Sequence, residues 1–141
     1  MASKFKNNLT VKLISKEMAE PIIKDPEIYD RITDDNCPSK ELFIMPDIEY
    51  VGGFIDKKLV SVYMETPKVH FQVLKDYRRY ARELFIKSMG KGEKTVEIPV
   101  LYQSVINFVK KTGFKVQTVI KSNYQKNGNY YDICRLKLWV S

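Results

Sequence analysis

Apolar and polar residues alternate over some short segments of this chain and recur at helical spacing over others. Leu9, Val11 and Leu13 fall on every second position, which predicts a first strand over Leu9–Ile14. Similar alternation, or clustered β-branched and aromatic residues, predicts six further strands. They cover residues 50–54, 59–66, 68–74, 95–99, 116–122 and 130–140.

Two helices are predicted directly after the first strand. Ser15 is the expected N-cap of a helix that runs to Lys24. Asp25 is the expected N-cap of the second, because Pro26 then takes the first helical position, where its missing N–H costs nothing. This second helix should end near residue 32, and residues 34–40 form a polar loop.

Two later helices each present one apolar face. In the first, which should end near Gly90, that face consists of Leu84, Phe85, Ser88 and Met89. The second covers residues 102–112 and is stopped by Gly113; its inward residues are Val105, Ile106 and Val109.

Turn signals complete the order of elements. Residues 55–58 join two strands as a hairpin, and Asn127-Gly128 is a strong turn signal for a long hairpin at the end of the chain. The order predicts an α/β or α+β fold, a mixed and mostly antiparallel sheet with helices on both faces. At 141 residues, the chain is expected to form a single domain over residues 1–141.

Composition narrows the function classes. Residues 1–6 lack the apolar centre of a signal peptide, and no apolar run is long enough to cross a membrane, so we expect an intracellular protein. Cys37 and Cys134 show no metal-ligand spacing, and His70 is the one histidine, so no metal site is expected. The net charge of +7 is spread along the chain, which favours a solvated basic surface over a nucleic-acid track.

Basic residues concentrate at one junction between a strand and a helix. Arg78, Arg79 and Arg82 lie within five residues, in a turn predicted between the strand that includes His70 and the helix that follows. The unpaired N–H groups of a helix N-terminus, together with the helix dipole, favour bound anions, and phosphate above all. We therefore expect a phosphate-bearing ligand at this turn.

Three segments, taken in this order, resemble the GCN5-related N-acetyltransferase (GNAT) superfamily, and in particular GNAT-like proteins of tailed bacteriophages. Residues 25–35 are similar to the phage-type first-helix segment that ends in paired aspartates, Asp34 and Asp35. The turn after His70 resembles the acyl-CoA pyrophosphate loop in its Arg-x-x-Ala form. Residues 106–114 are similar to the last helix of the superfamily, which ends in Gly-Phe.

The resemblance implies acetyl-CoA as co-substrate. The backbones of Val73 and Leu74 would pair with the pantetheine arm. The pyrophosphate would lie against the N–H groups of residues 79–82, with arginine side chains as further partners. The cofactor-binding residues it implies are Val73, Leu74, Arg78, Arg79, Tyr80, Ala81 and Arg82.

Catalytic candidates follow from the chemistry of amine acylation, which must remove a proton from an ammonium and return one to a thiolate. His70 is a candidate general base, the alternative being a hydrogen-bonded structural histidine. Tyr102 is a candidate general acid or a packing residue at a helix start. Glu65 could hold the substrate amine, or be an exposed strand carboxylate.

The sequence also departs from the family pattern. Arg79, Ala81 and Glu83 stand where the superfamily loop carries glycines, and Val109 stands where a catalytic tyrosine is common. Three hypotheses therefore remain: a phage-encoded acyl-CoA N-acyltransferase, a non-catalytic morphogenesis or internal virion protein on the same scaffold, and an inhibitor that binds nucleic acid or a host nucleic-acid enzyme through the basic surface. We expect the protein in the cytoplasm of an infected cell or in the virion. An amine acceptor, a phage or host protein and a homodimer remain open as partners.

Overall fold

The computed structural model describes residues 8–32, 47–66 and 68–141, which contain seven strands and four α-helices. In chain order these are β1 (Leu9–Ile14), α1 (Lys16–Ile23), α2 (Pro26–Ile32), β2 (Tyr50–Ile55), β3 (Lys58–Glu65), β4 (Val69–Val73), α3 (Ala81–Ser88), β5 (Gly92–Pro99), α4 (Gln103–Lys111), β6 (Lys115–Lys126) and β7 (Asn129–Val140). The elements predicted from the sequence are confirmed in type and order. No helix in these ranges is long and apolar enough to span a membrane.

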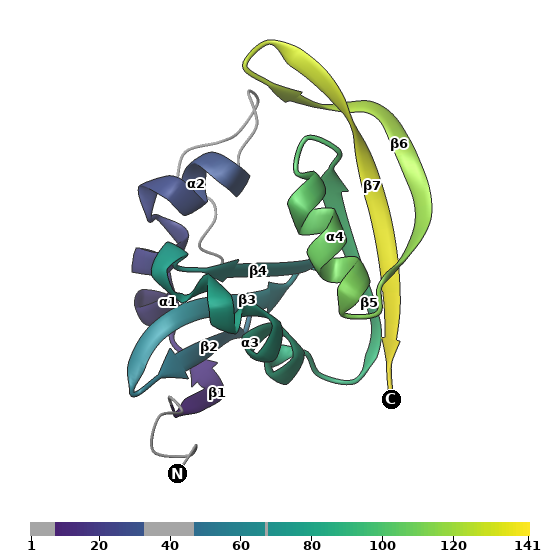
Figure 1. The fold of residues 1–141 in the computed structure, drawn as a ribbon. Coiled ribbons are helices and arrows are strands. Elements are labelled where there is room, and N and C mark those ends of the chain that lie inside the picture. The colour runs from purple at the N-terminus through teal and green to yellow at the C-terminus, as the bar shows by residue number, and fades with distance from the viewer. Residues whose placement is uncertain (1–7, 33–46, 67) are drawn as a thin grey trace.

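The strands form two antiparallel sheets, with the orders β1-β2-β3-β4 and β5-β7-β6. Within the described ranges, no ladder of backbone hydrogen bonds joins β4 to β5. Figure 1 shows that β4 begins beside β5 and then runs away from it, so that the two strands diverge. Where β4 and β5 diverge, the two sheets are therefore not joined by strand pairing.

Helices cover both sides of the first sheet. One core cluster packs α1 and α2 against β2 and β3 on one face, through Ile22, Ile28, Tyr50, Val62 and Met64 among others. On the opposite face, Leu84 of α3 packs against Ile55 and Val60. The predicted arrangement of helices on both faces is thereby confirmed.

The second sheet is joined to the first by an apolar core under α3 and α4. Phe85 of α3 lies at its centre, with ring contacts to Tyr63, Phe71, Phe108 and Phe114 at centroid distances of 5.0 to 6.3 Å. This core also includes Cys134. Because the core holds the two sheets together on this face, the divergence of β4 and β5 does not require direct pairing between them.

Local signals explain the element ends. The Ser15 hydroxyl accepts a hydrogen bond from the Met18 N–H, and the Asp25 carboxylate accepts from the Glu27 N–H, as expected of N-caps. Asn127 and Gly128 both have positive φ, which a two-residue hairpin turn with the right twist requires. The strands of that hairpin are longer than predicted, each spanning 12 residues.

The basic segment after β4 is helical, and the predicted turn is wrong. Residues Lys75–Tyr80 form a 3-10 helix that leads directly into α3. The segment contains neither glycine nor proline, so nothing in it prevents helical backbone. The first turn of this helical stretch therefore lies at Lys75, several residues before the arginines.

Candidate active site

The edge of β4 that faces β5 carries unpaired backbone groups. The Leu74 N–H donates to the Val60 carbonyl, and the Thr66 N–H donates to the Lys68 carbonyl. Hydrogen-bonded pairs alternate along an antiparallel ladder, so the backbone N–H and C=O groups of Val69, Phe71 and Val73 point away from β3. Val73 is thus available to a ligand between the strands, whereas the N–H of Leu74 already has a partner.

An acyl-CoA fits this edge. The pantetheine arm is a flexible chain with amide groups, and an extended chain can pair with an open strand edge. Buried backbone polar groups need partners, and Val69 is buried. A ligand that supplies hydrogen bonds along β4 would satisfy them.

The residues predicted to bind phosphate follow β4, in the 3-10 helix and at the start of α3, and they differ in the partners that they contact. Arg78 forms an ion pair with Glu27 of α2, and the Arg79 guanidinium stacks on the ring of Tyr80, 4.7 Å from its centroid. The Ala81 N–H donates to the Arg78 carbonyl, so it does not project freely as predicted. Arg82 is exposed and has no ion-pair partner among the described residues.

Tyr80 and Glu83, which flank the arginines, differ in their surroundings. Tyr80 packs against the cluster of Ile55, Val60 and Leu84. Glu83 is exposed. Arg79 and Arg82 are therefore the two predicted arginines whose charge no acidic side chain of the described residues cancels.

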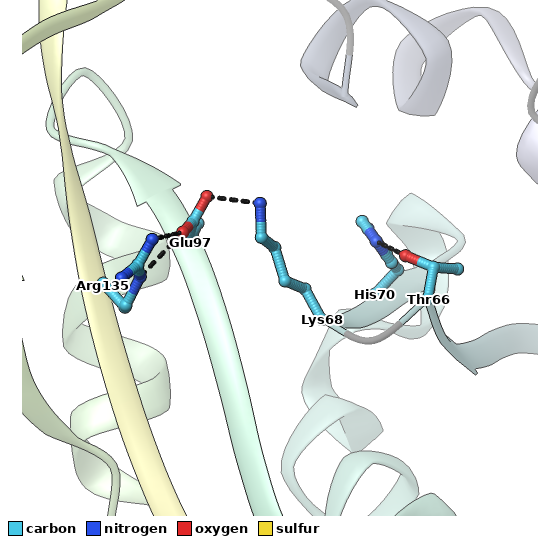
Figure 2. A network of polar contacts seen from close by, with 5 residues as sticks. All are labelled: Thr66, Lys68, His70, Glu97 and Arg135. Atoms are coloured by element: carbon cyan, nitrogen blue, oxygen red, sulfur yellow. Dashed lines mark hydrogen bonds and ion pairs between the residues drawn. The ribbon is translucent and has the colours of Figure 1, made fainter. Parts of the chain in front are cut away.

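His70 lies on the face of the sheet that α1 and α2 cover. It pairs across the ladder with Met64, which belongs to the core under those helices. Its Nε2 is 2.7 Å from the Thr66 hydroxyl oxygen, as Figure 2 shows. Burial, and secondarily the charge of Lys68, lowers the pKa of His70 below its usual value of 6.5. The imidazole is therefore neutral at pH 7, as a general base must be.

A polar network spans the place where the two strands begin to diverge. Lys68, directly before β4, places its Nζ 2.7 Å from Oε1 of Glu97 on β5. The other carboxylate oxygen of Glu97 accepts from Arg135 of β7, at 2.8 Å from Nε and 2.6 Å from Nη2. Figure 2 shows Lys68 and His70 pointing to the same side of β4.

Glu65 lies on the opposite face of the sheet from His70. It is the last residue of β3 and lies two positions after Tyr63, so it shares a face with Tyr63, a residue of the core under α3 and α4. Both Glu65 oxygens accept from Lys94 of β5, at 3.1 and 3.0 Å. The structure does not bring Glu65 together with His70. The amine that Glu65 contacts is the side-chain ammonium of Lys94 and not that of a substrate.

Tyr102 occupies the N-cap position of α4. Its ring contacts the ring of Tyr124 edge-on, with 6.4 Å between the two ring centroids, and packs against the core under α3 and α4. Among the described residues, no hydrogen bond joins it to His70. Its position matches the packing role that the sequence left open beside the general-acid role.

Sequence reasoning missed Thr66, Lys68, Lys94, Glu97 and Arg135. Glu97 pairs with Arg135 across the ladder of β5 and β7. The alternation of residues along β5 could have shown that Glu97 lies on the face of the strand opposite to the apolar Val96 and Ile98. Asp34 and Asp35 lie outside the described residues.

One surface hollow of the described part of the chain lies elsewhere. Its volume is about 390 Å³, and its lining comes from the β1–α1 junction and the residues leading into β2, not from β4 or β5. His70 is not among the residues that line it. Among the described residues, no group of three or more His, Cys, Asp or Glu side chains is placed to hold a metal ion.

No protein-family model matches the sequence, and no curated protein is detectably similar to it. Solved structures are similar in fold. The ribosomal-protein-S18-alanine N-acetyltransferase of Escherichia coli superposes with a TM-score of 0.68 over 95% of each chain, at 14% identity. For yncA of Salmonella typhimurium, solved with its cofactor acetyl-CoA, the TM-score is 0.69 over 95% of each chain, at 13% identity.

A GNAT-family acetyltransferase of Streptococcus pneumoniae gives a TM-score of 0.66 at 10% identity, covering 94% of this chain and all of that one. Identities this low establish the fold alone. The two sheets, their strand orders and the helices on both faces are thus those of a known architecture, and the chain has the GNAT acetyltransferase fold.

Proposed function

We propose that the protein is an acyl-CoA N-acyltransferase that moves an acetyl group from acetyl-CoA to an amine. The observation that carries the proposal is the open edge of β4, where the backbone groups of Val69, Phe71 and Val73 face a strand with which β4 does not pair. This edge runs from His70 toward the basic segment that begins at Lys75. One extended thioester carrier would therefore meet the base at one end and arginines at the other.

The chemistry assigned to His70 is proton removal. The neutral imidazole takes a proton from the acceptor ammonium, directly or through water, and the free amine attacks the thioester carbonyl. The new N–C bond forms and the C–S bond breaks, and the second proton that the attacking nitrogen loses ends on the CoA thiolate, giving the free thiol. We assign direct transfer to the acceptor; Cys134, the one cysteine among the described residues, is buried in the core and is not placed to carry an acyl group.

The pyrophosphate is assigned to Arg79 and Arg82. Both are exposed, and guanidinium groups make charge-assisted hydrogen bonds to phosphate oxygens. Arg78 contributes less to this role, because Glu27 already neutralises it.

Titration with CoA tests the cofactor assignment. Ligand that binds the folded state raises the melting temperature, so millimolar CoA and acetyl-CoA should both stabilise the protein. Replacing Arg79 and Arg82 together by alanine should weaken CoA binding by about tenfold or more. The double variant K110A/K111A changes the net charge equally at the end of α4 and should bind CoA as the parent does.

Release of the CoA thiol in the presence of a panel of amines tests the transfer itself. No stabilisation by CoA would overturn the cofactor assignment. Stabilisation without thiol release from any amine would favour the second candidate function, a non-catalytic protein on this scaffold.

Two residues at α4 support the second candidate function, a non-catalytic protein on this scaffold. Val109 is buried in the core at the position where the superfamily helix often carries its catalytic tyrosine, and Tyr102 packs against Tyr124. Residues 25–35 and the turn after His70 resemble GNAT-like proteins of tailed bacteriophages, so we infer a phage origin for either candidate. Detection of the chain in purified virions would distinguish a virion component from an enzyme confined to the infected cell.

A further inference from the structure

Two cations share one largely buried carboxylate, that of Glu97 on β5. The Glu97 side chain is only 12% exposed, and both of its oxygens are used, one by Lys68 and the other by Arg135. Burial alone would raise the pKa of Glu97, but the hydrogen bonds and charges of Lys68 and Arg135 outweigh it and lower the pKa. Glu97 is thus ionised, and the trio keeps one uncancelled positive charge.

Both cations retain donors that no described group uses. Lys68 contributes one of its three N–H bonds to Glu97, and Arg135 contributes two of its five. Their side chains are 45% and 37% exposed, so these remaining donors can reach solvent or a ligand. Among the described residues, Glu97 is the one acid that contacts either of them.

Neighbouring charges on the same strands do not cancel the excess. Lys137, two residues beyond Arg135 on β7, is already paired with Glu93 of β5 at 3.1 Å. The ion pair of Lys94 with Glu65 lies on the other face of the sheet. The surplus positive charge is therefore localised at Lys68 and Arg135.

We propose that Lys68 and Arg135 bind an anionic group of the acceptor, which makes the acceptor a primary amine that also carries a carboxylate or a phosphate. The inference rests on the proposed acetyl transfer at His70. Lys68 and His70 project from the same side of β4, two residues apart. An acceptor whose anion meets Lys68 and Arg135 thereby holds its amine near the imidazole.

The role of Glu97 in this site is to orient the two cations. A buried carboxylate fixes the Lys68 ammonium and the Arg135 guanidinium before the acceptor arrives, so less side-chain freedom is lost on binding. Guanidinium and ammonium groups both form charge-assisted hydrogen bonds to carboxylate and phosphate oxygens.

Matched acceptors test the proposal. Each amino acid is compared with the amine that its decarboxylation gives, and phosphoethanolamine with ethanolamine, by kcat/KM for CoA release. The parent protein should favour the anionic member of at least one pair. K68M and R135M should each reduce that preference by about 10- to 100-fold, because each removes a charge-assisted contact. K137M, which removes a paired cation from the same strand, should leave it unchanged.

The outcomes separate the two proposals. Turnover with equal preference in the parent, K68M and R135M overturns the anion site and leaves acetyl transfer standing. If no amine is acetylated, the transfer proposal fails. Calorimetric titration of the CoA-saturated protein with the same carboxylates and phosphates then tests whether the anion site exists. The anion site is overturned if these compounds do not bind, or if K68M and R135M do not weaken their binding. The carboxylate and phosphate pairs show which anion the site prefers.

Discussion

The hydroxyl of Thr66 lies 2.7 Å from Nε2 of His70, across the turn that joins β3 to β4. The backbone fixes this contact, because the Thr66 N–H donates to the Lys68 carbonyl within the same turn. In the tautomer in which the Nε2–H of His70 donates to the Thr66 hydroxyl oxygen, Nδ1 is the ring nitrogen that accepts a proton. Thr66 is thus a positioning residue for the proposed base.

T66V should lower kcat by about fivefold to tenfold, because a single hydrogen bond that orients the imidazole is lost. The KM for acetyl-CoA should not change, since Thr66 contributes nothing to the open edge of β4. T66S keeps the hydroxyl and should restore the rate. Equal rates in T66V and the parent would show that the hydrogen bond has no part in catalysis.

H70Q should lower kcat by about 10² to 10⁴, the range expected when a general base is removed. Glutamine keeps polar side-chain atoms near Thr66 but cannot take the proton at neutral pH. Melting temperature and CoA affinity of the variant, measured in parallel, show whether the change is confined to the chemical step. A rate within twofold of the parent would remove His70 from the mechanism.

The pH dependence of kcat/KM should report the lowered pKa of His70. The imidazole is active when neutral, so the rate should fall as the pH decreases through a midpoint below 6.5. Burial is the larger cause of the shift and the charge of Lys68 the smaller. K68M should therefore move the midpoint upward toward 6.5. K87M removes an exposed lysine of α3 and should leave the midpoint in place.

Local chemistry made much of the fold predictable. Ser15 and Asp25 cap their helices within three residues, and Asn127-Gly128 sets its turn within two, so each signal and its result are close in sequence. The face of β4 that carries His70 was not predictable, because it is set by the pairing of His70 with Met64. The contact of Lys68 with Glu97 joins residues far apart in sequence, and no spacing rule indicates it.

The ion pair of Lys94 and Glu65 gives a stability prediction. Lys94 is 5% exposed and its one acidic partner among the described residues is Glu65. E65Q leaves the buried ammonium without a counter-charge and should reduce the free energy of unfolding by about 1–3 kcal/mol, less than for a fully buried pair because Glu65 is 37% exposed.

K94M should cost less than E65Q, since methionine places an apolar chain in the same space and leaves Glu65 near solvent. The double variant E65Q/K94M should recover part of the loss. Urea denaturation measures all three. A loss for E65Q no larger than that for K94M would show that Lys94 is not dependent on Glu65.

Gly53 determines how closely α3 approaches the first sheet. A Cβ at this position would lie 2.1 Å from Oγ of Ser61 and 2.6 Å from Cδ2 of Leu84, the buried α3 residue. G53A should therefore reduce the free energy of unfolding by about 1–3 kcal/mol, because a well-packed core does not yield space without strain. The shift of Leu84 should also displace the basic segment before α3 and weaken CoA binding.

Gly90 provides the matched control, since a Cβ there would meet no atom closer than Nζ of Lys94 at 3.9 Å. G90A should change the free energy of unfolding by no more than about 0.5 kcal/mol and leave CoA affinity intact. Both variants are compared by urea denaturation and by CoA titration. If G53A lowers stability but leaves CoA affinity at the parent value, the position of α3 does not control the arginines, and the pyrophosphate must be held by groups nearer to the end of β4.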